Sequence, residues 1–230
     1  MKKRKLVIFG TGEIAELAKF YFEHDSDYEV AAFTADDEFV GTETFLNLPL
    51  VPFSKVVEKY PPGSFEMHVA LSYRKINRIR EEKYKLAKTA GYTLASYVST
   101  KSAFWPDLTH GDNCLILENQ TIQPTVKIGS NVMIWSGNHI GHGTHIGDHT
   151  YISSHVCISG HTKIGQRCFF GVNATTRDFV KIGDEVFVTM GALVTGDVQS
   201  GAVLLAANGT TFEADTRQGI SIKKKYFGLD

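Results

Sequence analysis

The sequence has no long apolar run, few cysteines and no excess of charge of either sign. Its apolar stretches, such as residues 6–9, fall far short of the roughly 20 residues that a membrane-spanning helix needs. This first stretch is also too short for a secretory signal peptide, so we expect a cytoplasmic protein without a membrane span. With 24 Lys and Arg against 25 Asp and Glu, no broad attraction to nucleic acid is expected.

The cysteine content argues against a disulfide framework or a zinc site. Cys114, Cys157 and Cys168 cannot all pair, and their spacing matches no zinc motif. We interpret them as packing residues in a reducing compartment. The 230 residues are 43% hydrophobic, which excludes disorder and is enough for one large domain or two small ones.

An aliphatic residue recurs at every sixth position over a long central stretch. Thirteen of the fourteen positions in this register are bulky and apolar. A period of six fits neither an amphipathic helix nor an alternating strand, but it is typical of short strands coiled into a β-helix. The register comprises Ile116, Ile122, Ile128, Ile134, Ile140, Ile146, Ile152, Ile158, Ile164, Phe170, Thr176, Ile182, Val188 and Val194.

Each repeat predicts one side of a three-sided coil. Side chains alternate along a strand, so the aliphatic residue and the residue two positions before it both fill the interior. Cys114 and Cys168 fall in these inward columns. A glycine often follows the aliphatic residue, and we expect it to supply corner conformations that residues with a Cβ resist. These glycines are Gly129, Gly141, Gly147, Gly165, Gly171 and Gly183.

The first hundred residues alternate between strand and helix patterns. Such alternation predicts a small Rossmann-like parallel sheet with helices on its faces. The predicted strands cover residues 5–9, 29–34, 67–71 and 93–98, and the predicted helices cover 13–22, 54–60 and 75–90. We therefore divide the chain into an α/β domain over residues 1–100, a β-helix over 101–195 and a tail over 196–230.

Motifs in both regions resemble a known enzyme family. They are Leu-Val-Ile-Phe-Gly-Thr-Gly at residues 6–12 and the coils that contain Ile140-Gly-His142 and Gly171-Val-Asn-Ala174. The combination resembles the left-handed β-helix (hexapeptide-repeat) nucleotide-sugar acetyltransferases, first the bacillosamine-pathway N-acetyltransferases and next the sialic acid O-acetyltransferases. The resemblance implies a left-handed parallel β-helix, acetyl-CoA as cosubstrate, no metal, and a homotrimer with acetyl-CoA between two subunits.

The resemblance also implies roles for individual residues. His142 matches the general base of the family, which stands at a coil corner after an aliphatic residue and a glycine or acid. Gly160 matches the backbone N–H that donates to the oxyanion. Gly160, Val172 and Gly191 match the positions along which the pantetheine and thioester of the family's cofactor run.

Several positions depart from the family's pattern. Trp135 and Tyr151 match two positions near the sugar, where the family commonly has small polar residues or histidine. Gly143 stands where a carboxylate often follows the catalytic histidine, so no residue is predicted to orient His142. Residues 206–210, Ala-Ala-Asn-Gly-Thr, replace the usual Gly-x-Pro-Ala-Lys stretch near the adenine of CoA.

The chemistry of acyl transfer explains these residue types. A thioester reacts with an amine or hydroxyl when a base takes the proton and donors face the oxyanion. Imidazole suits the base because its reference pKa of about 6.5 leaves it mostly neutral yet able to accept a proton. A backbone N–H needs no rearrangement and contributes roughly 3 to 4 kcal/mol. No covalent enzyme intermediate is required.

Other roles for the histidines stay open. His142 is alternatively a solvated corner residue, with His155 as the second candidate for the base. His149, His155 and His161 share a corner column but lie on three different sides of the coil. They cannot converge on a metal ion within one chain, so a metal site would have to be shared between subunits.

Gly10 and Gly12 follow the first predicted strand and open the first helix. This partial dinucleotide fingerprint implies close approach of the backbone to a phosphate. Asp36 and Asp37 follow the second strand, where a carboxylate can bond a ribose hydroxyl. In the resembling family this domain binds the nucleotide of the sugar donor; a purely structural turn and NAD binding are the alternatives.

These assignments predict an acetyl-CoA-dependent N-acetyltransferase. Its substrate would be a nucleotide-linked amino sugar, of the 4-amino-4,6-dideoxy type, used in surface polysaccharide or lipopolysaccharide biosynthesis. O-acetylation of a sugar hydroxyl and a non-catalytic nucleotide-sugar scaffold are the alternatives. In the tail, Lys223, Lys224 and Lys225 form either a contact with CoA phosphates or a solvated segment.

Overall fold

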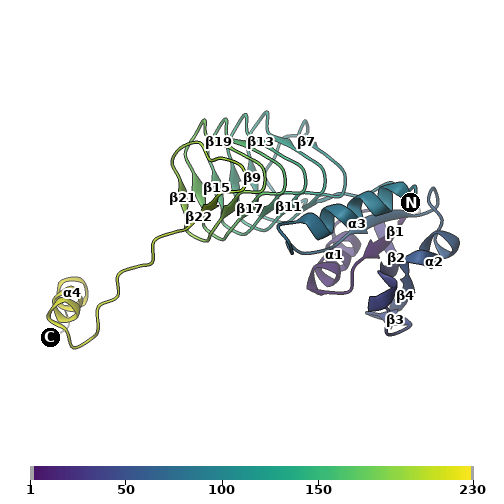
Figure 1. Ribbon diagram of the computed structural model, residues 1–230, viewed down its shortest axis with the longest axis horizontal. Helices are drawn as coiled ribbons and strands as arrows, with labels where there is room; N and C mark the ends of the chain where they lie inside the picture. Colours follow the sequence, from purple (N-terminus) through teal and green to yellow (C-terminus); the bar gives the residue numbers. More distant parts are fainter. Residues whose placement is uncertain (1–2, 229–230) are drawn as a thin grey trace.

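The computed structural model describes residues 3–228, and its N-terminal domain is built on a five-stranded sheet (Figure 1). The strand order is β3-β4-β2-β1-β5, with β3 antiparallel to β4 and the other pairs parallel. The strands are β1 (Arg4–Phe9), β2 (Tyr28–Ala35), β3 (Thr44–Phe45), β4 (Leu48–Pro52) and β5 (Glu66–Val69).

Helices cover both faces of this sheet. The helical segments are α1 (Glu13–His24), the 3-10 turn η1 (Asp37–Phe39), α2 (Phe53–Lys59) and α3 (Arg78–Thr89). Side chains of β1 alternate between the two faces: Leu6 and Ile8 pack in the cluster that contains α1, and Val7 and Phe9 in the cluster that contains α2 and α3. Burial on both sides explains why this strand is an uninterrupted apolar run.

The predicted strand over residues 93–98 does not join this sheet as a strand. Leu94 forms a single bridge with Met67, and β6 (Tyr97–Val98) starts a sheet of the β-helix instead. The additional strands of the N-terminal sheet are the short hairpin β3–β4. Its turn uses positive φ at Leu46 (49°) and Asn47 (62°), without the glycine that would have marked it in the sequence.

The β-helix consists of three parallel sheets of two-residue strands, as the repeat predicted. One sheet contains β6, β8 (Leu115–Ile116), β11 (Met133–Ile134), β14 (Tyr151–Ile152), β17 (Phe169–Phe170), β20 (Phe187–Val188) and β22 (Val203–Leu204). A second contains β9 (Thr121–Ile122), β12 (His139–Ile140), β15 (Cys157–Ile158), β18 (Thr175–Thr176) and β21 (Leu193–Val194). The third contains β7 (Thr109–His110), β10 (Lys127–Ile128), β13 (His145–Ile146), β16 (Lys163–Ile164) and β19 (Lys181–Ile182).

The three sheets differ in the side chains they turn outward, which are the first residues of their strands. We call them the apolar sheet (β6 to β22, outward residues such as Leu115 and Phe169), the neutral sheet (β9 to β21, such as Thr121 and Cys157) and the basic sheet (β7 to β19, such as Lys163). The chain passes from the apolar to the neutral to the basic sheet and back. Each corner is named after the two sheets that it joins.

The interior of the β-helix is a column of mostly aliphatic side chains. From β8 to β21, the second residue of each strand and the residue two positions before it are buried, including Cys114 and Cys168, as expected. Burial raises the pKa of the Cys114 thiol to about 12 and that of Cys168 to about 11, which leaves both unreactive.

The corner glycines do not have the role that we predicted for them. Positive φ occurs two residues further along, for example at Asn131, His149 and Asn173. The glycine that follows each aliphatic residue instead lets two coils approach: a Cβ at Gly141 would lie 2.5 Å from the backbone nitrogen of Gly160. The prediction was wrong because two positions of the corner are constrained, one by φ and one by space.

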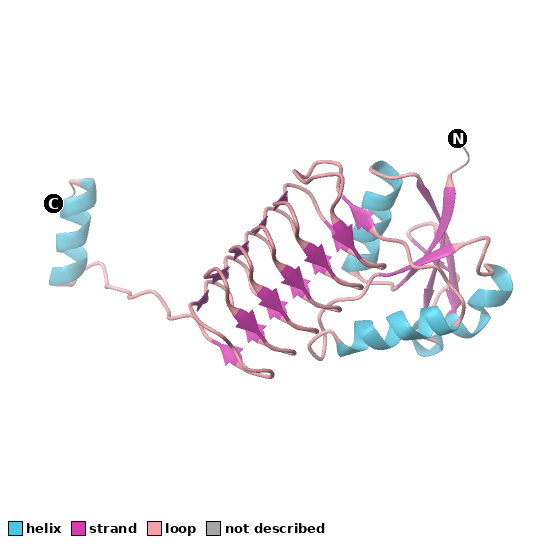
Figure 2. Ribbon diagram, turned by 90° about the horizontal axis from the view of Figure 1, so that it is seen from above, coloured by secondary structure: helices cyan, strands magenta, loops and turns pink. Residues whose placement is uncertain are grey.

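The N-terminal domain packs directly on the apolar sheet. Leu115, Met133 and Tyr151 belong to the same buried cluster as helix α1. The sheets extend slightly beyond the predicted bounds of 101–195, from Tyr97 to Leu204. Helix α4 (Arg217–Phe227) follows an extended segment and lies clear of the β-helix (Figures 1 and 2). Among residues 3–228, no helix has the length and apolarity to cross a membrane.

Candidate active site

His142 lies on an exposed corner between the neutral and basic sheets, two residues after the end of β12. Its backbone N–H and its ring Nδ1 both lie 2.9 Å from Oε1 of Gln123, one coil earlier. A backbone N–H can only donate, so the Gln123 atom that faces it is the amide oxygen. That oxygen can only accept, which places the ring hydrogen on Nδ1 and leaves Nε2 as a proton acceptor. Gln123 is therefore the orienting partner that sequence reasoning did not find.

Gly160 lies beside the His142 ring on the next coil. A Cβ at residue 160 would lie 2.9 Å from Cε1 of His142, so any larger residue would displace the ring. The N–H of His142 is bonded to Gln123, but the N–H of Gly160 donates to no acceptor within the described part of the chain. An imidazole whose Nε2 can accept a proton and a backbone N–H without an acceptor thus lie side by side.

Two aromatic rings extend the corner across the outer surface. The His142 ring meets His161 edge to face, with centroids 4.8 Å apart, and His161 stacks on Phe179 at 4.8 Å and 11°. Phe179 is 66% exposed. Next to these rings, a hollow of about 670 Å³ lies on the basic sheet. Its lining residues include Lys127, Lys163 and Lys181.

Val172 and Gly191 lie at a different corner, between the apolar and neutral sheets. The N–H of Gly191 donates to the carbonyl of Val172 at 2.8 Å, and the Val172 side chain is 41% exposed. Val172 borders a groove of about 950 Å³ lined by Tyr73, Phe169, Phe187 and Met190 among others. Within one chain, the structure does not bring these two residues to His142.

Trp135 and Tyr151 lie on the apolar sheet, on the same side of the molecule as Val172. The indole N–H of Trp135 donates to the hydroxyl of Tyr151, and the Tyr151 ring stacks on Phe169 with centroids 5.3 Å apart. Burial raises the pKa of Tyr151 to about 12, so its hydroxyl keeps its proton. The guanidinium of Arg80 lies 5.8 Å from the ring centroid. These two predicted sugar contacts are adjacent to each other but not to His142.

Gly10 and Gly12 lie where β1 ends and α1 begins. Gly10 has φ of 132°, and a Cβ there would lie 2.7 Å from the carbonyl oxygen of Ala70. Gly12 is the N-cap of α1. Backbone of this kind at a helix N-terminus allows a phosphate to approach closely.

Asp36 and Asp37 follow β2 at the same edge, and both have partners within the chain. Asp36 forms an ion pair with Lys83 at 2.9 Å. Asp37 accepts bonds from the hydroxyl and N–H of Ser54 at 2.6 and 3.2 Å, which lower the pKa of its carboxyl.

His149 occupies the sealed corner between the basic and apolar sheets, under helix α3. The N–H of Val69 donates to Asn113 Oδ1, Asn113 Nδ2 donates to Asn131 Oδ1, and Asn131 Nδ2 donates to His149 Nδ1. This chain makes Nδ1 an acceptor and places the ring hydrogen on Nε2, which lies 3.7 Å from Oε1 of Glu81. Burial lowers the pKa of His149, against the raising effect of Glu81.

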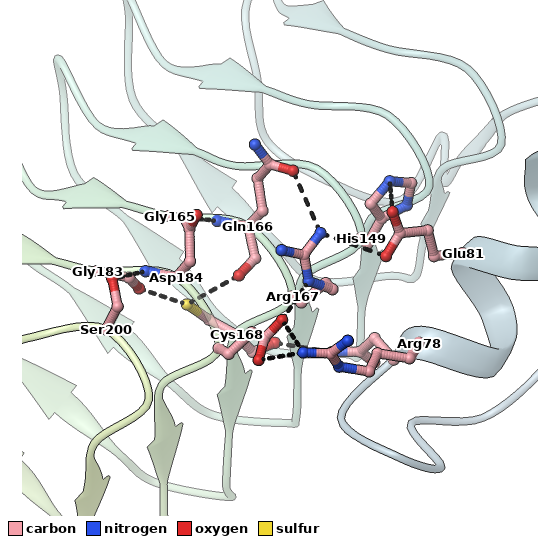
Figure 3. Close-up of polar contacts among 12 residues, drawn as sticks. Arg78, Glu81, His149, Gly165, Gln166, Arg167, Cys168, Gly183, Asp184 and Ser200 are labelled. Carbon is pink, nitrogen blue, oxygen red and sulfur yellow. Dashed lines mark hydrogen bonds and ion pairs between the residues drawn. The ribbon is translucent and has the colours of Figure 1, made fainter.

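Ion pairs close this corner around His149 (Figure 3). Arg167 lies 3.3 Å from Glu81 and 2.8 Å from Glu185, and Arg78 binds both oxygens of Glu185 at 2.7 Å. They join α3 to the coils, which is a structural role.

The three histidines of the corner column are separated from one another, as the six-residue register predicted. His149, His155 and His161 occupy three different corners, and His155 is exposed at the corner of Val172. Over residues 3–228, no group of three or more His, Cys, Asp or Glu side chains could hold a metal ion.

Two family models match the repeats of the β-helix. Residues 125–160 match the bacterial transferase hexapeptide model of six repeats, and residues 161–196 match the hexapeptide repeat of succinyl-transferase. No curated protein sequence matches the chain. The predicted fold class, an α/β N-terminal domain followed by a left-handed parallel β-helix of hexapeptide repeats, is confirmed.

Solved structures identify similar individual proteins. PerB from Caulobacter crescentus, in complex with CoA and GDP-perosamine, aligns with a TM-score of 0.77 at 22% identity, over 86% of this chain and 92% of PerB. The acetyltransferase domain of PglB from Neisseria gonorrhoeae, in complex with acetyl coenzyme A, gives 0.73 at 19% identity over 87% and 95%. A histidine-to-asparagine mutant of the Caulobacter crescentus perosamine N-acetyltransferase gives 0.69 at 19% over 88% and 97%. These neighbours are acetyltransferases, the class that the sequence resembles.

Proposed function

We propose that this protein transfers the acetyl group of acetyl-CoA to the amine of a nucleotide-linked amino sugar. The observation that carries the proposal is the pairing of His142 with Gly160: an imidazole held in its proton-accepting tautomer beside a backbone N–H without an acceptor. The similar structures that contain CoA and GDP-perosamine, or acetyl coenzyme A, support this class of substrates.

In the proposed reaction, the neutral amine of the sugar attacks the thioester carbonyl while Nε2 of His142 takes its proton. The bond from Nδ1 to Gln123 keeps the ring in the orientation and tautomer that the step needs. The N–H of Gly160 donates to the oxygen of the tetrahedral intermediate. When the carbon–sulfur bond breaks, the imidazolium returns the proton to the CoA sulfur, which leaves the acetamido sugar and free CoA.

We propose that each site is shared between two subunits of a homotrimer. The base and oxyanion donor lie at the corner between the neutral and basic sheets, whereas Val172, Gly191 and the Trp135–Tyr151 pair lie toward the corner between the apolar and neutral sheets. These residues do not meet within one chain. They can meet between two neighbouring copies whose different corners face each other. Acetyl-CoA would then run along Gly160 of one copy and along Val172 and Gly191 of the other.

The N-terminal domain is proposed to bind the nucleotide of the sugar. Gly10 and Gly12 permit approach of a phosphate to the start of α1, and Asp36 and Asp37 stand at the end of the neighbouring strand for the ribose. We propose a 4-amino-4,6-dideoxy sugar as acceptor, surface polysaccharide synthesis as the pathway and the cytoplasm as the location.

The test is an acetyl-transfer assay with a matched pair of acceptors. Acetyl-CoA is incubated with nucleotide-linked 4-amino sugars, each paired with the same sugar carrying a hydroxyl at that carbon, and the released CoA thiol is measured. We expect thiol release with at least one amino sugar and none with its hydroxyl partner. Release with hydroxyl acceptors alone would identify an O-acetyltransferase, and binding without release would identify a scaffold; either result contradicts the proposal.

A further inference from the structure

The basic sheet presents three lysines and one histidine in direct register. Lys127, His145, Lys163 and Lys181 occupy equivalent positions on β10, β13, β16 and β19, and we call this row the basic ladder. Neighbouring strands lie about 4.8 Å apart, so Lys163 and Lys181, which are directly opposite each other, leave the sheet at close spacing. Like charges directly opposite each other on a sheet are destabilising. The ladder therefore carries a cost that folding alone does not explain.

The carboxylates that border the ladder do not neutralise it. Asp148, Asp184 and Asp197 accept backbone N–H bonds, each at 2.8 Å, from Ser130, Gln166 and Lys181 respectively. Within residues 3–228, the ladder side chains form no ion pair. Lysines elsewhere in the same chain do have acidic partners, for example Lys19 with Glu23, Lys85 with Glu81 and Lys88 with Asp112.

The ladder also lines a concave surface with an aromatic wall. All four of its residues border the hollow of about 670 Å³, together with His161 and Phe179. Phe179 is 66% exposed and stacks on His161, which in turn contacts the His142 ring. An exposed ring beside unpaired cations combines a stacking surface for a planar base with partners for phosphate oxygens.

We propose that the basic ladder binds the phosphate groups of a nucleotide, with the base of that nucleotide stacked on Phe179. This inference rests on the proposed function, which supplies one ligand of that chemistry beside His142, the phosphoadenosine end of acetyl-CoA. The nucleoside diphosphate of the sugar is assigned to the N-terminal domain.

The test measures binding by calorimetry, independently of acetyl transfer. The variant carries Lys163→Gln and Lys181→Gln, and the matched control carries Lys3→Gln, an exposed lysine before β1. The probes are CoA, dephospho-CoA, GDP, UDP and inorganic pyrophosphate. We expect the double variant to bind CoA about tenfold or more weakly, with a smaller difference at high salt. The control should bind as the wild type does.

The probes separate the two sources of phosphate. A loss for CoA that is smaller for dephospho-CoA assigns the ladder to the cofactor and supports the proposal. A loss for GDP or UDP alone assigns the ladder to the nucleotide sugar, which contradicts both the cofactor assignment and the proposed nucleotide site of the N-terminal domain. Unchanged affinity for every probe overturns it. A change of oligomeric state without a change of affinity also overturns it, because the ladder would then face acidic groups of another copy.

Failure of the ladder and failure of the proposed function give different results. If the wild type transfers acetyl groups and the double variant binds all probes normally, only the ladder assignment fails. If the wild type shows no acetyl transfer, weaker pyrophosphate binding by the double variant still supports a phosphate site. Sedimentation of both variants gives the oligomeric state in the same buffer.

Discussion

Two histidines at different corners of the β-helix differ in burial and in the position of the ring hydrogen. His142 is exposed, and its Nδ1 donates to the oxygen of Gln123; His149 is buried, and its Nδ1 accepts from the nitrogen of Asn131. The ring hydrogen is therefore on Nδ1 in one and on Nε2 in the other. In His142 the free nitrogen can take a proton, whereas in His149 both nitrogens face partners of the chain.

The difference comes from what covers each corner. Helix α3 packs over His149, with Tyr84 edge to face at 5.3 Å and Glu81 near Nε2. No element of residues 3–228 covers His142 in this way, and a hollow opens beside it. The same repeat thus provides a structural corner where the N-terminal domain is present and an accessible corner where it is absent.

The largest expected effect is that of replacing the two histidines. We expect His142→Ala to lower kcat by about 100-fold or more and to leave Tm unchanged, because the exposed ring supports chemistry rather than packing. We expect His149→Ala to cost about 2 kcal/mol of stability, because it leaves a cavity and an unpaired Asn131, while kcat of the folded enzyme is retained. Steady-state kinetics and thermal unfolding measure both; the reverse pattern would contradict the comparison.

A second prediction concerns the space beside His142. Gly160→Ala would place a Cβ 2.9 Å from Cε1 of the ring, so we expect the ring to rotate away and kcat to fall by about tenfold to 100-fold. The matched control is Gly196→Ala, since a Cβ at residue 196 meets nothing within 4 Å. Equal kinetics of the two variants would remove Gly160 from the site.

The two amide partners provide the third prediction. Gln123→Ala removes the acceptor that fixes the His142 tautomer, and we expect kcat to fall by about tenfold with little change in Tm. Asn131→Ala interrupts the buried amide chain, and we expect a stability loss of about 1 to 3 kcal/mol with kcat retained. If Gln123→Ala is as active as the wild type, Gln123 does not position the base; rescue in Gln123→Glu would confirm that an acceptor is what the ring needs.

The smallest expected effect is a difference in acid sensitivity. Burial lowers the pKa of His149, with Glu81 and Asp148 opposing the shift and Arg80 and Lys85 adding to it. Below about pH 6.5 the unfolded chain is protonated at this residue while the folded chain is not, so stability falls as the pH falls. We expect the wild type to lose more unfolding free energy than His149→Gln between pH 7 and 5. If denaturant unfolding gives the same loss of unfolding free energy for both proteins over this pH range, the burial of a neutral His149 is contradicted.

Much of the fold could be predicted because the repeat constrains it locally. The inward column from Ile116 to Val194 required only the alternation of side chains along a strand, and it is correct. The predicted role of the corner glycines was wrong because positive φ is required two residues after the position at which neighbouring coils approach closely. The β3–β4 hairpin was missed because Leu46 and Asn47 form its turn without glycine.

The candidate site was predictable only in part, for a different reason. His142 and Gly160 follow from the repeat register and the family resemblance, but Gln123 has no motif, because its contact depends on the stacking of two coils. The buried amide chain of His149 depends on Asn113 and Val69, whose proximity is set by domain packing. Spacing within one corner cannot reveal which corner another domain covers.

The central claim, a site completed by unlike corners of two copies, is tested most directly by mixing two inactive variants. His142→Ala lacks the base, and Val172→Glu places a charge at an exposed position of the other corner. In randomly mixed trimers about one interface in four combines an intact His142 with an intact Val172, so the account predicts recovery of about a quarter of wild-type activity. A mixture no more active than its parents would contradict it, because base and cofactor groove would then belong to one chain.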